Sequence, residues 1–111
     1  MATGIELIAS ERKRQTEVEG WTPEHDNEHA ECELLAAAVN YLELGEFVSH
    51  YGRTDGETFF HGHPPSRSFR WPFSKEWWKP DYQDPVRNLI KAGALIAAEI
   101  DRLLRKKGTT Q

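Results

Sequence analysis

The segment that begins at Asp84 constrains the fold of this chain most strongly. Asp84 is a favoured helix N-cap, and Pro85 suits the first helical position, where a missing N–H costs nothing. The basic residues near the other end of the segment complement the helix dipole. The pattern predicts a helix over residues 85–106 and a frayed tail at 108–111. Its apolar stripe is formed by Leu89, Ala92, Gly93, Ile96, Ile100 and Leu103.

Two earlier segments also have helical patterns. Ile5, Ile8 and Ala9 begin an apolar stripe that predicts a helix over residues 4–19, with Gly20 as its C-terminal cap. Thr22-Pro23 is a second start signal, followed by one acidic turn. A wide apolar arc then predicts a helix over residues 28–43 that ends at Gly45. We therefore expect a mainly α fold, a three-helix core in one domain.

The residues between the second and third helices form a long aromatic and basic insertion, at about 45–83. A loop of this length in a compact domain is usually functional or has structure of its own. Asp55-Gly56 is a hairpin turn signal, and β-prone residues flank it: Phe47, Val48 and Tyr51 before it and Thr58, Phe59 and Phe60 after it. The insertion is therefore expected to contain a short β-hairpin.

Composition narrows the functional classes. The chain has 111 residues, a net charge of −4 and Cys32 as its only cysteine, so it offers neither an internal disulfide nor a cysteine zinc site. The acidic balance argues against general nucleic-acid binding. No apolar run is long enough to cross a bilayer, and the first residues lack the pattern of a secretion signal. A cytoplasmic protein that contacts no membrane is expected.

Three of the four tryptophans lie at Trp71, Trp77 and Trp78, interleaved with Arg70, Lys75 and Lys79. Aromatic faces beside cations suit a ligand that is both aromatic and anionic, such as a nucleotide. The competing interpretation is that these rings complete the core of a small domain. Both can hold if one tryptophan is buried and another borders the ligand.

The ligand site is predicted where the end of the first helix meets the start of the third, because a helix N-terminus favours anions. Arg87 and Lys91 are four residues apart and could clamp phosphates from one helix face. No catalytic residue and no cofactor are assigned. The predicted ligand-binding residues are Arg12, Trp21, Thr22, His25, Asp26, Trp71, Trp77, Trp78, Lys79, Arg87 and Lys91.

Some charged residues fall on the predicted apolar faces. Arg12 lies on the first helix's stripe, Glu31 within the second helix's arc, and Glu99 at the edge of the third helix's stripe. A buried charge is costly unless it is paired, so we expect a buried Arg12–Glu31 ion pair, or a cleft where a ligand completes the coordination. The many small residues at 36–38 and 92–98 also predict a symmetric homodimer or higher homo-oligomer.

A metal site is a weaker hypothesis. His25 and His29 lie one helical turn apart, and Glu28 and Glu31 have the Glu-x-x-Glu spacing that can hold Mg²⁺. The competing interpretation is a solvated acidic helix start, which the helix dipole favours. In the metal interpretation, Glu99 would join Glu28 and Glu31 from the third helix.

The chain resembles a widespread family of small phage and prophage proteins of little established function. The motifs that carry this resemblance are ERKRQ at 11–15, EGWTPEHD at 19–26, WWKP at 77–80 and RNLIKAGALI at 87–96. A second similarity is to RyR domains, through Gly20-Trp21, Asp26 and His29, although Ala30 replaces the family's His-Pro pair. RyR-like modules in prokaryotic conflict systems are thought to bind nucleotide-derived signals. The resemblances imply a protein that sequesters such a host defence signal in the host cytoplasm without converting it.

A rival similarity is to the all-α nucleotide pyrophosphohydrolases of the MazG type, which use Mg²⁺. Glu28 and Glu31 match the first carboxylate pair of that family, but Glu99 and Asp101 have an i,i+2 spacing that does not share a helix face. The two-metal chemistry needs four converging carboxylates. A third alternative is an inhibitor of a host protein that uses the tryptophans as a binding hot spot.

Overall fold

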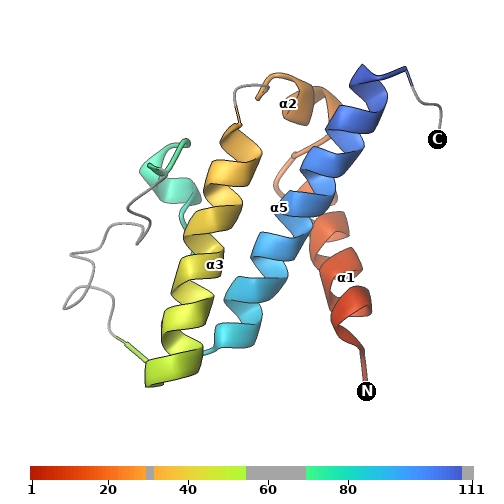
Figure 1. Cartoon of the computed structure of the whole chain (residues 1–111). Helices are drawn as coiled ribbons and strands as arrows, with labels where there is room; N and C mark the ends of the chain where they lie inside the picture. The colour runs from red at the N-terminus through yellow and green to blue at the C-terminus, as the bar shows by residue number, and fades with distance from the viewer. Residues whose placement is uncertain (30–31, 55–69, 109–111) are drawn as a thin grey trace.

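The computed structural model describes residues 1–29, 32–54 and 70–108. Over these ranges the chain is mainly α-helical and contains no β-strand (Figure 1). The prediction of a mainly α fold with a helical core is confirmed: α5 lies between α1 and α3 and contacts both. The described elements are α1 (Gly4–Glu17), α2 (Pro23–Asn27), α3 (Glu33–Tyr51), a 3-10 turn (Lys75–Trp77) and α5 (Pro85–Lys106).

Local capping explains where the helices begin. Thr3 and Glu6 form a reciprocal capping box at α1, with N···O distances of 2.8 and 3.2 Å. Thr22 accepts a hydrogen bond from the backbone N–H of His25 at α2, and Asp84 accepts one from that of Val86 at α5. The start signals before α2 and α5 therefore act as the sequence predicts, and α5 has the predicted bounds.

Gly45 does not end the second long helix, so that prediction is wrong. α3 begins at Glu33 and continues to Tyr51, with Gly45 buried inside it. A Cβ atom at Gly45 would lie 2.8 Å from Leu89 Cδ2, closer than such atoms approach. The glycine therefore allows α3 and α5 to pack closely, and it has no capping role here.

Because α3 extends to Tyr51, it includes the residues that were predicted to form the first strand of the hairpin. Phe47, Val48 and Tyr51 belong to this helix and cannot form the first strand. The expected second strand, residues 58–60, and the turn at Asp55-Gly56 lie outside the described residues. The insertion thus begins after Tyr51, several residues later than predicted.

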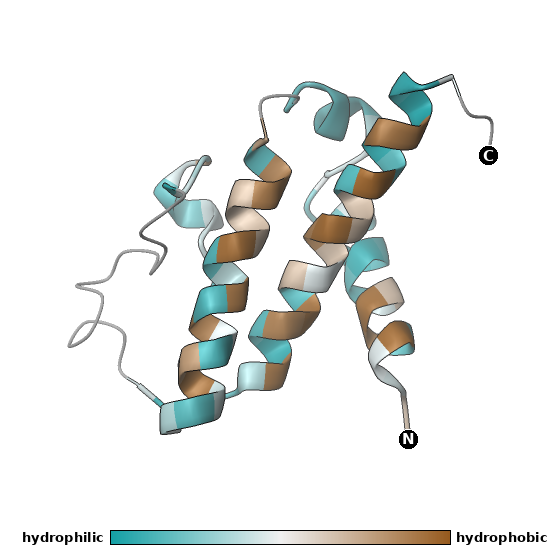
Figure 2. Ribbon diagram, viewed as in Figure 1, coloured by the Kyte–Doolittle hydropathy of each residue, from teal (hydrophilic) through white to brown (hydrophobic). Residues whose placement is uncertain are grey.

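The inward faces of α1 and α5 differ from the predicted apolar stripes. α5 turns Leu95 and Ala98 inward together with Asn88, Lys91, Glu99 and Arg102, while Leu89, Ile96, Ile100 and Leu103 are exposed. Figure 2 shows hydrophobic residues on successive turns along the length of α5. α1 likewise buries Glu11 and Gln15 and exposes Ile5. The polar inward row is tolerated because its members pair with one another or with backbone groups.

The hydrophobic core lies between α3, α5 and the aromatic segment 70–83. Leu34, Leu44 and Leu95 are fully buried, and Trp21 and Trp78 join the same cluster. Trp71, Phe73, Trp77 and Tyr82 pack against its edge. Among the described residues, none of the helices combines the length and apolar character that crossing a bilayer requires.

Asn88 attaches the aromatic segment to α5. Its Oδ1 accepts a hydrogen bond from the backbone N–H of Asp81 at 2.9 Å, and its Nδ2 donates to the Asp81 carbonyl at 2.6 Å. The Asn88 side chain is fully buried. One amide therefore fixes the chain just before α5 and positions the neighbouring tryptophans.

We predict that Asn88→Ala lowers the free energy of unfolding by about 2 kcal/mol or more, because both backbone groups of Asp81 lose their partner. Urea denaturation measures the change. Gln83→Ala, an exposed position in the same segment, is the control. A loss below about 0.5 kcal/mol, the range of ordinary surface substitutions, would contradict this role for Asn88.

Candidate functional site

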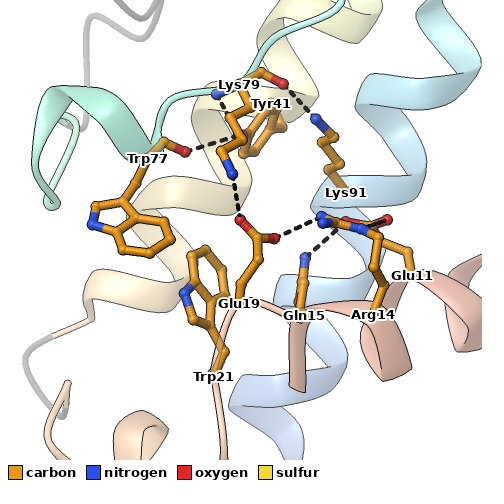
Figure 3. A pocket seen from close by; sticks show the side chains of 9 residues that line it. All are labelled: Glu11, Arg14, Gln15, Glu19, Trp21, Tyr41, Trp77, Lys79 and Lys91. Carbon is orange, nitrogen blue, oxygen red and sulfur yellow. Dashed lines mark hydrogen bonds and ion pairs between the residues drawn. The ribbon is translucent and has the colours of Figure 1, made fainter. Parts of the chain in front are cut away.

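Two adjoining hollows lie where the end of α1 meets the aromatic segment. The inner pocket has a volume of about 10 Å³, space for about one water molecule. The outer cleft has a volume of about 420 Å³. The inner pocket is lined by Glu11, Arg14, Gln15, Glu19, Trp21, Tyr41, Trp77, Lys79 and Lys91 (Figure 3). The outer cleft is lined by Glu19, Trp21, His25, His29, Pro72, Phe73, Ser74 and Trp77.

A chain of alternating charges runs along the inner pocket. Glu11 binds Arg14 through two hydrogen bonds of 2.9 and 2.6 Å and lies 3.3 Å from Arg87 of α5. Glu19 forms one ion pair with Arg14, at 2.6 Å, and a second with Lys79, at 2.9 Å. The ion pairs therefore connect α5, α1 and the aromatic segment through two carboxylates.

Lys91 adds a further positive charge to this network. Its Nζ donates a hydrogen bond to the backbone carbonyl of Lys79 and lies 5.5 Å from the centre of the Tyr41 ring. Burial, followed by the charge of Arg87, lowers the pKa of Lys91. Three cationic side chains of the pocket, Arg14, Lys79 and Lys91, thus face two carboxylates, a surplus of one positive charge, and Arg87 adds a fourth cation beside Glu11 outside the lining.

The cations keep Glu11 ionised although it is buried. Burial by itself raises the pKa of this carboxyl group. The hydrogen bonds from Arg14 and the charges of Arg14, Arg87 and Lys91 act in the opposite direction, and together they lower the pKa of Glu11 below its usual value. The pocket consequently holds fixed charges of both signs with the positive sign in excess.

Gln15 presents an unpartnered acceptor at the inner pocket. Its Nε2 donates to Glu11 at 3.4 Å, while its buried Oε1 has no hydrogen-bond partner among the described residues. A buried acceptor without a donor is unfavourable, so this atom is suited to a water molecule or a ligand N–H or O–H.

Aromatic rings line the outer cleft. Trp21 and His25 are stacked, with ring centres 5.5 Å apart and an interplanar angle of 7°. Trp77 lies 6.1 Å from Trp21, and Phe73 lies edge-on to His29 at 5.0 Å. Because Trp77 is only partly buried and borders both hollows, the cleft offers aromatic surface directly beside the charged pocket.

The predicted site residues divide between the hollows and the core. Trp21, His25 and Trp77 line the cleft, and Lys79 and Lys91 line the inner pocket. Trp78 is buried 4.8 Å from the Tyr41 ring, and Trp71 packs edge-on against both. The core interpretation therefore describes Trp78 and Trp71, while Trp77 is a wall of the hollows.

Arg12 pairs with Asp26, whereas the sequence suggested Glu31. The Arg12 guanidinium donates to the fully buried Asp26 carboxylate and to the Trp21 carbonyl at 3.3 Å. α1 ends at Glu17 with Val18 as its C-cap, so Gly20 is not the predicted cap; its φ of +77° instead turns the chain between α1 and α2, and Asp26 of α2 comes within reach of Arg12. Glu31 lies outside the described residues. Thr22 has a structural position as the cap of α2.

Of the predicted metal ligands, His25 and His29 have ring centres 4.5 Å apart, and Glu31 lies outside the described residues. Glu28 is exposed at the end of α2, and Glu99 forms two hydrogen bonds with Arg102, at 2.7 and 2.9 Å. Residues 1–29, 32–54 and 70–108 contain no group of three or more His, Cys, Asp or Glu side chains that could hold a metal ion. They therefore lack the converging carboxylates that two-metal chemistry needs.

Sequence reasoning missed the residues that form the inner pocket's polar wall. Glu11, Gln15 and Glu19 are each four residues apart, so they share one side of α1 and its continuation. This polar row, beside Arg14, was the available signal. The apolar stripe that begins at Ile5 and Ile8 points to a different face of this helix, and Ile5 is exposed.

Comparisons with known proteins give no relative for this chain: no family model matches it, and neither does any curated protein or solved structure. The resemblances to phage proteins, RyR domains and MazG-type enzymes therefore stay predictions.

We predict that Arg12→Met destabilises the fold by about 3 kcal/mol, because it leaves the buried Asp26 carboxylate without its guanidinium partner. Thermal and urea denaturation measure the loss. Lys13→Met, at the neighbouring exposed position, should change stability by less than about 0.5 kcal/mol. Equal stabilities of the two variants would show that the pair is not structural.

Tyr41 provides a test at alkaline pH. Burial raises the pKa of its hydroxyl group to about 12, above that of an unfolded chain, so the folded protein retains the proton longer. This stabilisation is complete below about pH 10 and is lost as pH rises through about 12. We predict that wild type loses on the order of 2 kcal/mol more stability across this range than Tyr41→Phe does.

Denaturation at pH 9, 10, 11 and 12 gives the comparison. The lowered pKa of Lys91 changes the free energy of unfolding in the opposite direction as pH rises, and this effect is present in both wild type and Tyr41→Phe. Tyr51→Phe, at an exposed position, should retain the wild-type pH dependence. Parallel curves for wild type and Tyr41→Phe would show that the Tyr41 hydroxyl does not titrate in this window.

Proposed function

We propose that the protein binds a small molecule that is both aromatic and anionic, of the nucleotide type, without converting it. The observation that carries the proposal is the adjacency of an aromatic cleft to a pocket with surplus positive charge. Glu19, Trp21 and Trp77 border both hollows, so one ligand can contact both. Base stacking and phosphate pairing are the two interactions that such a site supplies.

Lys79 is the residue best placed to receive the anion. It is half exposed, and its Nζ lies 5.5 Å from the Trp77 ring centre and 2.9 Å from Glu19. A phosphate competes with Glu19 for this ammonium group, and its negative charge offsets the excess positive charge of the inner pocket. A flat base then packs on Trp77 and Phe73 in the outer cleft.

Binding is favoured over turnover because both carboxylates of the inner pocket are engaged by cations. Glu11 is held by Arg14 and Arg87, and Glu19 by Arg14 and Lys79. A carboxylate held in this way is a poor general base. The resemblances to phage proteins and to RyR domains make a nucleotide-derived host defence signal the biological ligand that we propose, and the host cytoplasm the place of action.

Isothermal titration calorimetry against mono-, di- and cyclic nucleotides and ADP-ribose derivatives tests this function. We expect wild type to bind at least one compound. Trp77→Leu should weaken binding about tenfold or more, through lost stacking. Lys79→Met should weaken it and also reduce its dependence on salt concentration.

Two matched variants serve as controls. Trp71→Leu removes a tryptophan that packs on Tyr41 and Trp78. Lys75→Met removes an exposed lysine from the 3-10 turn that contains Trp77. Both should retain wild-type affinity. If no compound binds, the proposed function is wrong, and if Trp77→Leu and Lys79→Met bind as wild type does, the site is wrong. If chromatography detects a hydrolysed nucleotide after incubation with the protein, the pyrophosphohydrolase function would be favoured instead.

A further inference from the structure

The outward face of α5 carries a regular row of large apolar side chains. Val86, Leu89, Ile96, Ile100 and Leu103 are each between 40% and 52% exposed. With Gly93 they have alternating spacings of three and four residues along the helix. This is the heptad pattern of a seam between two helices, sustained here over 18 residues of α5, from Val86 to Leu103.

Neighbouring helices extend this apolar face. Ile5 of α1 is 82% exposed and lies three residues before Ile8, which contacts Gly93. Leu42 of α3 is also exposed and lies three residues before Gly45, against which Leu89 packs. Exposed aliphatic side chains of α1 and α3 thus lie within one helical turn of residues that contact the α5 row, and apolar surface of this kind marks interaction sites.

The small residues that first suggested a dimer have a different role. Ala36, Ala37 and Ala38 of α3, and Ala92, Ala94 and Ala98 of α5, are buried within the chain. Their size serves the close packing of helices inside one molecule. These alanines are therefore not available to a partner, whereas the aliphatic row is exposed.

We propose that this face binds a second copy of the chain, with the two α5 helices packed antiparallel across a two-fold axis between Gly93 and Ile96. In this arrangement Val86 of one copy lies opposite Leu103 of the other, and Leu89 opposite Ile100. Ile8 of α1 lies over Gly93, so near the axis the partner meets Ile8 together with Ile96. Both ends of the seam are then closed by aliphatic side chains.

Charge at the ends of α5 argues for a second copy in this orientation. Asp84 is exposed at the start of the helix, and Lys106 and Lys107 are exposed at its end. An antiparallel pair places the acid of each copy beside the lysines of the other and opposes the two helix dipoles. A parallel pair places like charges together. The chain thus carries its own complementary surface.

Sedimentation velocity with light scattering tests the dimer. We expect wild type to dimerise at micromolar concentration, and Ile96→Glu combined with Ile100→Glu to raise the dissociation constant on the order of 100-fold or more, since two carboxylates would enter an apolar seam. Val18→Glu, a matched change at an exposed site outside the row, should leave it unchanged. A monomeric wild type, or a double variant that still dimerises, would overturn the proposal.

Cysteine crosslinking tests the orientation without relying on the stability of the glutamate variants. In a Cys32→Ser background, Val86→Cys and Leu103→Cys proteins should crosslink when mixed under mild oxidation, and neither should crosslink alone. Crosslinking of each protein with itself would indicate a parallel pair. If the mixture still contains dimer but forms no crosslink, the dimer interface must lie on another surface of the protein.

Discussion

The buried carboxylate of Glu11 is the interaction on which the arrangement of this molecule depends. It joins Arg14 of its own helix to Arg87 of α5, and through Arg14 it is connected to Glu19 and Lys79. α1 therefore packs on α5 through ion pairs as well as through Ile8, which lies over Gly93. A buried carboxylate is tolerated only with such partners, so the position of α1 and the charge of the pocket have one cause.

The same network explains why the aromatic segment is part of the site. The backbone of Lys79 receives a hydrogen bond from Lys91 and donates one to Tyr41, while its side chain pairs with Glu19. Asn88 fixes the chain a few residues later. The segment before α5 is thus held at several points, and Trp77 is placed between the charged pocket and the aromatic cleft. Binding surfaces supported in this way need little reorganisation to receive a ligand.

The inward polar row has a second consequence on the other side of α5. Because Asn88, Lys91, Glu99 and Arg102 occupy the buried side, the aliphatic row is turned outward. The proposed ligand site and the proposed dimer face therefore lie on opposite sides of one amphipathic helix. A substitution on one face should leave the function of the other intact, which makes the two proposals separable by experiment.

The sequence by itself determined the helix starts and the class of fold, because caps and prolines act locally. Thr22-Pro23 and Asp84-Pro85 begin helices where predicted, and α5 has the expected bounds. The sequence also placed tryptophans and cations near one another. Tertiary structure alone decided which face of each helix points inward, how far α3 continues past Gly45, and that Asp26 is the partner of Arg12. Periodicity reports where apolar side chains lie on a helix, but the burial of a charge depends on partners from distant segments. A surface that serves a second molecule has the same periodicity as a core.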